Sequence, residues 1–141
     1  MVHPLIGIHA ALGEIGVMAF LWVFIELLNP TEKRIKRARI AATIGLIFIL
    51  ISWFTGGFYY VKYYGPQIKP LIKEGPAPWA HSIVMEVKEH VFLFIPFLAL
   101  FTAAMVSKYG NEMMRKKEIK NAALILSVLI SGFYDTFQLI L

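Results

Sequence analysis

The sequence lacks cysteine and carries little charge. None of its 141 residues is cysteine, and Asp, Glu, Lys and Arg together make up 16%. The first absence excludes disulfides, thiolate-bound metals, iron–sulfur clusters and covalently attached c-type haem, so histidine and carboxylate remain as metal ligands. With 58% hydrophobic residues, the chain is too apolar for a soluble protein of this length. The sequence therefore predicts one integral membrane domain over residues 1–141.

Four apolar runs each have about the 20 residues that are needed to cross a bilayer. They span residues 5–28, 40–61, 79–106 and 121–141. The first run has no basic segment before it, contains Glu14 and lacks a cleavage site of small residues, so it is expected to remain as a helix and not to be a signal peptide. We expect an all-α, four-helix transmembrane bundle.

The basic residues gather in two of the connections, and the formal net charge is +5. The connections at residues 29–39 and 107–120 hold Lys33, Arg34, Lys36, Arg37 and Arg39, then Lys108, Arg115, Lys116, Lys117 and Lys120. The positive-inside rule places both in the cytoplasm, so both termini are predicted outside. The expected location is a prokaryotic cell membrane. Orientation explains the positive charge, and we expect no nucleic-acid binding.

All four histidines lie at the predicted outer ends of the first and third helices, which run in the same direction and sit diagonally in a simple bundle. At 1.5 Å per residue from the cytoplasmic ends, His9 and His90 lie at about 30 and 27 Å. His3 and His81 lie at about 39 and 40 Å. The deeper pair predicts the axial ligands of one haem b near the outer face. Helical phase places His81 opposite His90, so His3 and His81 are expected to serve propionates, a second metal or the surface.

Small residues are expected beside a flat macrocycle. Gly13 and Gly16 follow His9 on the same helical stripe, and Gly56-Gly57 lie level with the proposed iron. Close helix packing explains these glycines equally well.

Carboxylates offer a second chemistry. Glu86 and His90 share a helix face at i, i+4, and Glu89 lies beside them. With His9 they compose a possible site for non-haem iron, manganese or zinc, although the Glu-x-x-His spacing of di-iron bundles is absent. Glu14 and Asp135 lie within apolar runs, where carboxylates often transfer protons.

The segment His3-Pro4-Leu5-Ile6-Gly7-Ile8-His9 resembles the start of a family of small four-helix membrane proteins that are thought to bind haem. The wider design resembles a membrane cytochrome b, with histidines on two like-directed helices. The resemblance implies haem b. The intrahelical histidine spacings of six and nine residues are shorter than those of two-haem cytochromes, which favours a single haem.

The leading hypothesis is a haem b-binding electron-transfer subunit of the membrane, rather than a stand-alone enzyme. The expected partners are lipid and a redox partner or larger complex at the outer face, with quinol as a further candidate. Lys69 and Lys73 are expected to guide an acidic partner. The alternatives are a non-haem metal membrane enzyme and a cofactor-free assembly subunit.

Overall fold

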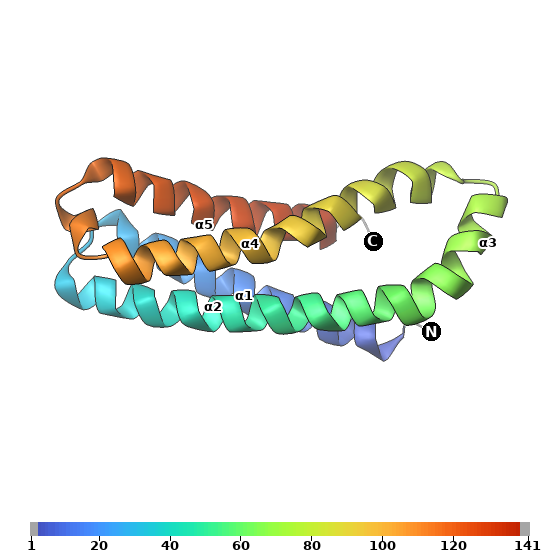
Figure 1. The fold of residues 1–141 in the computed structure, drawn as a ribbon, viewed down its shortest axis with the longest axis horizontal. Helices are drawn as coiled ribbons and strands as arrows, with labels where there is room; N and C mark the ends of the chain where they lie inside the picture. Colours follow the sequence, from blue (N-terminus) through green and yellow to red (C-terminus); the bar gives the residue numbers. More distant parts are fainter. Residues whose placement is uncertain (1–2, 139–141) are drawn as a thin grey trace.

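The chain folds as a bundle of long helices in the computed structural model, which describes residues 3–138. The elements in chain order are α1 (Pro4–Leu28), α2 (Glu32–Tyr59), η1 (Tyr60–Ile68), α3 (Lys69–Glu74), η2 (Ala80–Met85), α4 (Glu86–Tyr109), η3 (Glu112–Met114) and α5 (Lys117–Gln138). The described residues contain no strand. The prediction of an all-α four-helix bundle is confirmed (Figure 1).

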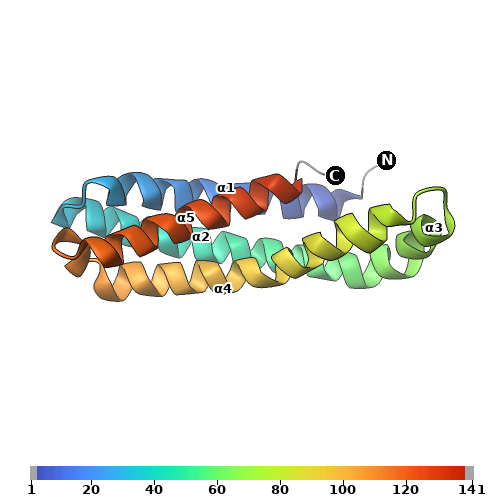
Figure 2. The same cartoon turned by 90° about the horizontal axis from the view of Figure 1, so that it is seen from above.

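The order of the helices around the bundle follows from their neighbours. α1 packs against α2 and α5, and α4 packs against the same two helices. α1 and α4 are therefore diagonal, as expected for the two helices that carry the histidines (Figure 2). The α1–α2 and α4–α5 connections lie at one end of the bundle, whereas α3 lies at the other end (Figure 1).

Three described helical segments are long and apolar enough to cross a membrane: Pro4–Leu28, Glu32–Glu74 and Ala80–Tyr109. The described part of α5 is not one of them, and residues 139–141 of the fourth predicted run lie outside the described residues. Large aromatic side chains such as Phe54 and Phe97 are exposed, whereas alanines fill much of the core. A surface of this kind suits contact with lipid, and together with the long apolar helices it indicates an integral membrane protein.

The first connection is shorter than predicted. Residues 29–31 alone separate α1 from α2, so the basic residues expected in a loop lie on the first turns of α2. Thr31 caps this helix, because its hydroxyl oxygen accepts a hydrogen bond from the Arg34 amide at 3.3 Å. Ile35 and Ala38 are buried, and their burial extends the helix past the end of the apolar run.

Glu26 holds α1 and α2 together near this connection. Its side chain is 7% exposed and accepts hydrogen bonds from Arg34 Nε at 2.9 Å and Arg37 Nε at 2.6 Å. Trp22 Nε1 donates to the same carboxylate at 2.9 Å. Two arginines that the topology prediction uses for orientation therefore also neutralise a buried acid.

The chain between the second and third long helices, residues 62–80, is largely helical, although the apolar runs of the sequence predict a connection there. α2 continues into the π-helix η1 and then into α3, so only residues 75–79 connect Glu74 to η2. Pro66 lies inside η1 and has no amide to donate, which a locally widened helix accommodates. Pro70 lies in the first turn of α3, where a missing amide costs little.

The third connection is short and polar. Lys116 Nζ lies 2.6 Å from Glu112 Oε2, one helical turn away. This carboxylate raises the pKa of Lys116 above its usual value. Both side chains are well exposed, so the pair contributes little to stability.

Candidate functional site

His9 is fixed in the bundle by Ser52 of α2. Its Nδ1 lies 2.8 Å from the Ser52 main-chain oxygen, and the Ser52 hydroxyl donates to the His9 main-chain oxygen at 2.8 Å. A nitrogen that faces a carbonyl oxygen must carry the proton, so Nδ1 donates and Nε2 retains its lone pair. Metal-ligating histidines are commonly held in this way.

The surroundings of His9 explain one of the predicted glycines. A Cβ atom on Gly56 would lie 2.7 Å from His9 Nδ1 and 3.1 Å from the Phe92 ring. The Phe92 ring itself contacts His9 edge-on, with 5.9 Å between the ring centroids. Gly56 therefore makes room for the imidazole.

The other glycines also face side chains of neighbouring helices. A Cβ atom on Gly13 would lie 1.7 Å from the Tyr134 hydroxyl oxygen, and one on Gly16 would lie 2.8 Å from Ile49. Gly57 is less crowded, since its nearest contact would be Phe92 at 4.0 Å. The contacts therefore indicate that Gly13 and Gly16 allow neighbouring helices to pack closely.

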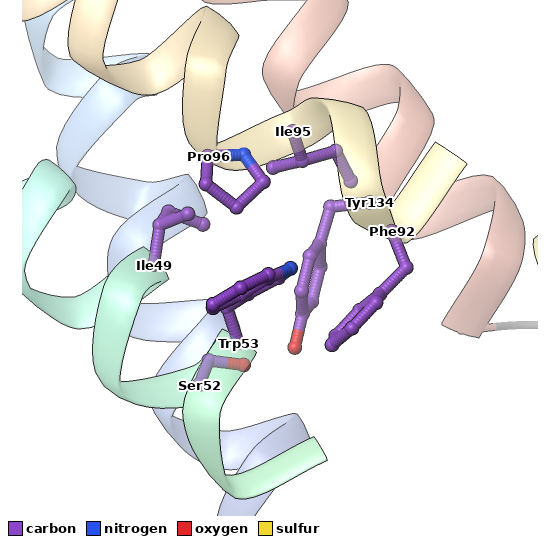
Figure 3. A pocket seen from close by; sticks show the side chains of 7 residues that line it. All are labelled: Ile49, Ser52, Trp53, Phe92, Ile95, Pro96 and Tyr134. Atoms are coloured by element: carbon purple, nitrogen blue, oxygen red, sulfur yellow. The ribbon is translucent and has the colours of Figure 1, made fainter. Parts of the chain in front are cut away.

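A small cavity lies in the core between α2, α4 and α5 (Figure 3). It has a volume of about 20 Å³ and is lined by Ile49, Ser52, Trp53, Phe92, Ile95, Pro96 and Tyr134. That volume is enough for about one water molecule, whereas sites for larger organic ligands have about 300 Å³ or more. A porphyrin does not fit this part of the interior.

The structure does not bring His9 and His90 together. His90 is exposed on α4, and its Nδ1 lies 2.6 Å from the Glu86 main-chain oxygen of the same helix. Phe92 occupies the position opposite His9 instead. The described packing does not favour His9 and His90 as the two axial ligands of one iron, and their pairing stays a prediction.

His81, and not His90, is the histidine of this region that faces the interior. Its side chain is 0% exposed, and Nδ1 lies 2.9 Å from the Tyr64 hydroxyl oxygen. His81 is buried and His90 is exposed, which agrees with the predicted placement on different faces; the choice of His90 over His81 as a ligand stays a prediction. Depth along a helix does not determine which way a side chain points.

A polar cluster surrounds His81 at the end of the bundle that carries α3. We define the polar cluster as Tyr60, Tyr64, His81 and Glu89. The Glu89 carboxylate interacts electrostatically with the other three side chains, and the Tyr60 and Tyr64 rings stack with centroids 5.2 Å apart. Two buried atoms of the cluster, His81 Nε2 and Glu89 Oε1, have no hydrogen-bond partner in the described part of the chain.

The sequence contained a signal for this cluster. Tyr60 and Tyr64 are one helical turn apart and share a helix face, whereas His81 and Glu89, eight residues apart, are rotated by about 80° from each other in an ideal helix. The same tyrosines also fit an aromatic belt at the membrane interface, so their spacing alone does not predict a cluster. The π-helices η1 and η2, which set the phase of three of the four residues, have no comparable signature in the sequence.

His3 has a structural role. It precedes α1, and its Nδ1 accepts a hydrogen bond from the Leu5 amide at 3.2 Å. The imidazole also lies against the Tyr63 and Tyr59 rings, at centroid distances of 4.4 and 5.3 Å. These contacts tie the start of α1 to the end of α2 and to η1.

The carboxylates do not form a metal centre within one chain. Glu14, Glu86 and Asp135 are exposed, whereas Glu89 belongs to the polar cluster. Over residues 3–138, no group of three or more histidine, cysteine, aspartate or glutamate side chains is arranged to hold a metal ion. The predicted set of His9, Glu86, Glu89 and His90 is thus not assembled. Proton transfer by Glu14 or Asp135 stays a prediction.

Comparison with known proteins gives no assignment, so the resemblance at residues 3–9 rests on that motif alone. No protein-family model matches the chain, and searches of curated proteins and of solved structures gave no match.

Proposed function

We propose that this protein is a membrane subunit of an electron-transfer complex and that its polar cluster binds the head group of a quinol. The observation that carries the proposal is the pair of buried polar atoms without partners, His81 Nε2 and Glu89 Oε1. A buried polar atom without a partner costs about 1–3 kcal/mol. A ligand that hydrogen-bonds to both atoms recovers that free energy.

A quinol head group has the complementary chemistry. It presents two hydroxyl groups at opposite edges of an apolar ring, so one hydroxyl can donate to Glu89 Oε1 and the other can donate to His81 Nε2. The oxidised quinone has carbonyl oxygens, which accept a hydrogen bond from His81 when the Tyr64 hydroxyl donates to Nδ1 and the proton lies on Nε2. The two tautomers of His81 therefore suit the two redox forms of the ligand.

The cluster also supplies proton acceptors. Oxidation of a quinol to a quinone releases two electrons and two protons. The His81 imidazole and the Glu89 carboxylate each accept one proton, while the electrons pass to a redox centre of the partner complex. The topology prediction places this end of the bundle outside the cytoplasm, where the protons are released.

Binding of a short-chain quinone tests the proposal. We expect quenching of tryptophan and tyrosine fluorescence that saturates with the detergent-solubilised protein. His81→Ala and Glu89→Gln are each expected to weaken binding about tenfold, because the first removes a hydrogen bond to the ligand and the second replaces a charged acceptor by a neutral amide, each change being worth about 1.4 kcal/mol. Glu14→Gln is the control, because Glu14 is exposed away from the cluster. Unchanged affinity in both cluster variants would mean that ordered water, and not a quinone, satisfies the two atoms.

Haem b remains a second candidate, favoured by one observation. The Nδ1 atoms of His9, His81 and His90 each lie within 2.9 Å of an oxygen atom. The Nε2 atoms are therefore the ones left for metal ligation. A porphyrin between His9 and His90 does not fit the described packing, so we derive no mechanism through haem.

A visible spectrum of the purified protein decides on this candidate. A haem b subunit is expected to show a Soret band and sharp bands after reduction, and His9→Ala should abolish them. His3→Ala serves as the control, since the contacts of His3 are structural. A colourless protein that also fails to take up added haemin would eliminate the haem candidate and leave the quinone measurement unaffected. Failure of both measurements would favour the cofactor-free assembly subunit.

A further inference from the structure

Positive charge is concentrated at the end of the bundle that holds the α1–α2 and α4–α5 connections (Figure 1). Residues 26–39 and 107–120 contain ten lysines and arginines and four glutamates, whereas the rest of the chain contains four lysines and five acidic residues. The ion pairs of the described structure involve two of these glutamates, Glu26 and Glu112. A large excess of positive charge therefore remains at this end, which we call the basic end.

Four lysines of the basic end continue the lipid-facing surfaces of three helices. Residues seven or eleven positions apart return to nearly the same face of an α-helix. Lys108 of α4 lies seven residues after the exposed Phe101, and Lys117 of α5 lies eleven residues before the exposed Val128. On α2, Lys33 and Lys36 precede a stripe of exposed side chains that recur every three or four residues: Ile40, Ile44, Ile47, Ile51, Phe54 and Phe58.

We define the lysine collar as Lys33, Lys36, Lys108 and Lys117. All four side chains are exposed, and none has an ion pair in the described structure. The collar therefore presents uncompensated ammonium groups directly beside surfaces that suit acyl chains.

The length of the stripe on α2 sets the level of the lysines. From Ile40 to Phe58 the helix rises by about 27 Å, close to the hydrocarbon core of a bilayer at about 30 Å. Lys36 lies one helical turn beyond this stripe. Its methylene groups can follow the end of the apolar surface while the ammonium group reaches the level of the lipid head groups.

The helix dipoles give a second reason to expect an anion at the basic end. Lys33 and Lys117 lie in the first turns of α2 and α5, where the positive end of the macrodipole disfavours a cation. Each of these turns contains one glutamate, Glu32 or Glu118, but the basic residues outnumber them. An anion bound here interacts favourably with the lysines and with the dipoles of both helices.

We propose that the lysine collar binds the head groups of acidic phospholipids, whose acyl chains lie along the apolar stripes. Each lysine attracts a lipid phosphate, and a head group with a net negative charge is favoured over a zwitterionic one. Because the lysines continue the apolar stripes, one amphiphilic molecule contacts both, which a soluble anion does not. The proposal uses no residue of the polar cluster and is independent of quinol binding.

The lipid selectivity of the full chain in phosphatidylcholine bilayers tests the proposal. Electron paramagnetic resonance of spin-labelled lipids measures the association of phosphatidylglycerol with the protein relative to that of phosphatidylcholine. We expect a ratio of about two to five at low salt, because one lysine near a head group favours an acidic lipid about fivefold and only the sites at the basic end gain from it. In about 1 M salt the ratio should approach one, since the Debye length falls to about 3 Å.

Replacing the four collar lysines by glutamine should also bring the ratio close to one. The matched control replaces the four lysines outside the basic end by glutamine and should keep the preference; these are Lys62, Lys69, Lys73 and Lys88. The collar lysines are exposed, so their replacement is not expected to prevent folding, and circular dichroism checks both variants. Both leaflets have the same composition, so the orientation of the chain does not affect the result.

Three outcomes would overturn the proposal. The first is equal association of the two lipids with the unsubstituted chain. The second is a loss of preference in the control variant as large as that in the collar variant, which indicates that total charge is responsible. The third is a preference that inorganic phosphate removes at constant ionic strength, which indicates a site for a soluble anion.

Discussion

Replacing Arg34 and Arg37 together by methionine is expected to lower the free energy of unfolding by up to about 4 kcal/mol. The Glu26 side chain is 7% exposed, whereas those of Arg34 and Arg37 are 27% and 42% exposed. Removing both guanidinium groups leaves a buried carboxylate with Trp22 as its remaining hydrogen-bond donor. The unpaired carboxylate can instead take up a proton, which costs about 4 kcal/mol at pH 7. The loss in the free energy of unfolding therefore cannot exceed about that value.

Replacing Glu26 instead of the two arginines should lower the free energy of unfolding by less. Glu26→Met removes the buried charge, and the two partly exposed arginines can turn toward water and lipid head groups. A triple variant, with methionine at positions 26, 34 and 37, should regain most of the stability lost by the double variant, because no unpaired charge remains. The three free energies together separate the cost of an orphaned charge from the value of the ion pairs.

Unfolding in mixed micelles with increasing dodecyl sulfate, followed by circular dichroism, measures these differences. Lys33→Met with Lys36→Met is the matched control, since both lysines are exposed on the same turns of α2 and have no ion pair in the described structure. It removes two positive charges and should change stability by less than about 1 kcal/mol. Equal losses in both double variants would show that net charge, and not the Glu26 network, is what the bundle requires.

The existence of the helices was predictable because membrane spans are long and the hydrophobic signal adds up over many residues. Their ends were less predictable. α2 begins at Glu32, well before its apolar run, because Thr31 caps it and Glu26 neutralises the arginines. Such an extension depends on a neighbouring helix, which the local sequence does not reveal.

The candidate site illustrates a second limit. Counting residues correctly placed the histidines at the ends of two diagonal helices, but it left their rotation about the helix axes undetermined. His81 is buried and His90 is exposed, although both lie in the same helical segment. Helical phase predicted different faces for these two residues, but which of the two faces is buried depends on packing against the neighbouring helices, which the local sequence does not reveal.

The glycines show a third limit of prediction from sequence. A glycine can make room either for a cofactor or for a side chain of a neighbouring helix, and the sequence does not distinguish the two. Gly56 makes room for the His9 imidazole, and Gly13 makes room for the Tyr134 side chain. The sequence predicted small residues at the level of the histidines but not what fills the space beside them. That information comes from the contact between α1 and α5, two helices at opposite ends of the chain.

Gly13→Ala is expected to destabilise the bundle by about 3 kcal/mol, near the upper end for overpacking by one methyl group. The new Cβ atom would lie 1.7 Å from the hydroxyl oxygen of Tyr134 and 2.0 Å from its Cζ atom. The ring must therefore move, and its hydrogen bonds of 3.2 Å to the main-chain oxygens of His9 and Ala10 are strained or lost. Unfolding in mixed micelles gives the free energy.

Two further variants make this last prediction specific to the contact between α1 and α5. Gly7→Ala lies on the same helix with nothing within 4 Å of its new Cβ atom, so it should stabilise the protein by about 0.5–1 kcal/mol through helix propensity. In a Tyr134→Ala background the space beside Gly13 is open, and Gly13→Ala should then have almost no further effect. Additive losses in the double variant would show that Gly13 faces something other than Tyr134, as a glycine beside a macrocycle would, and would return the haem hypothesis to this part of the bundle.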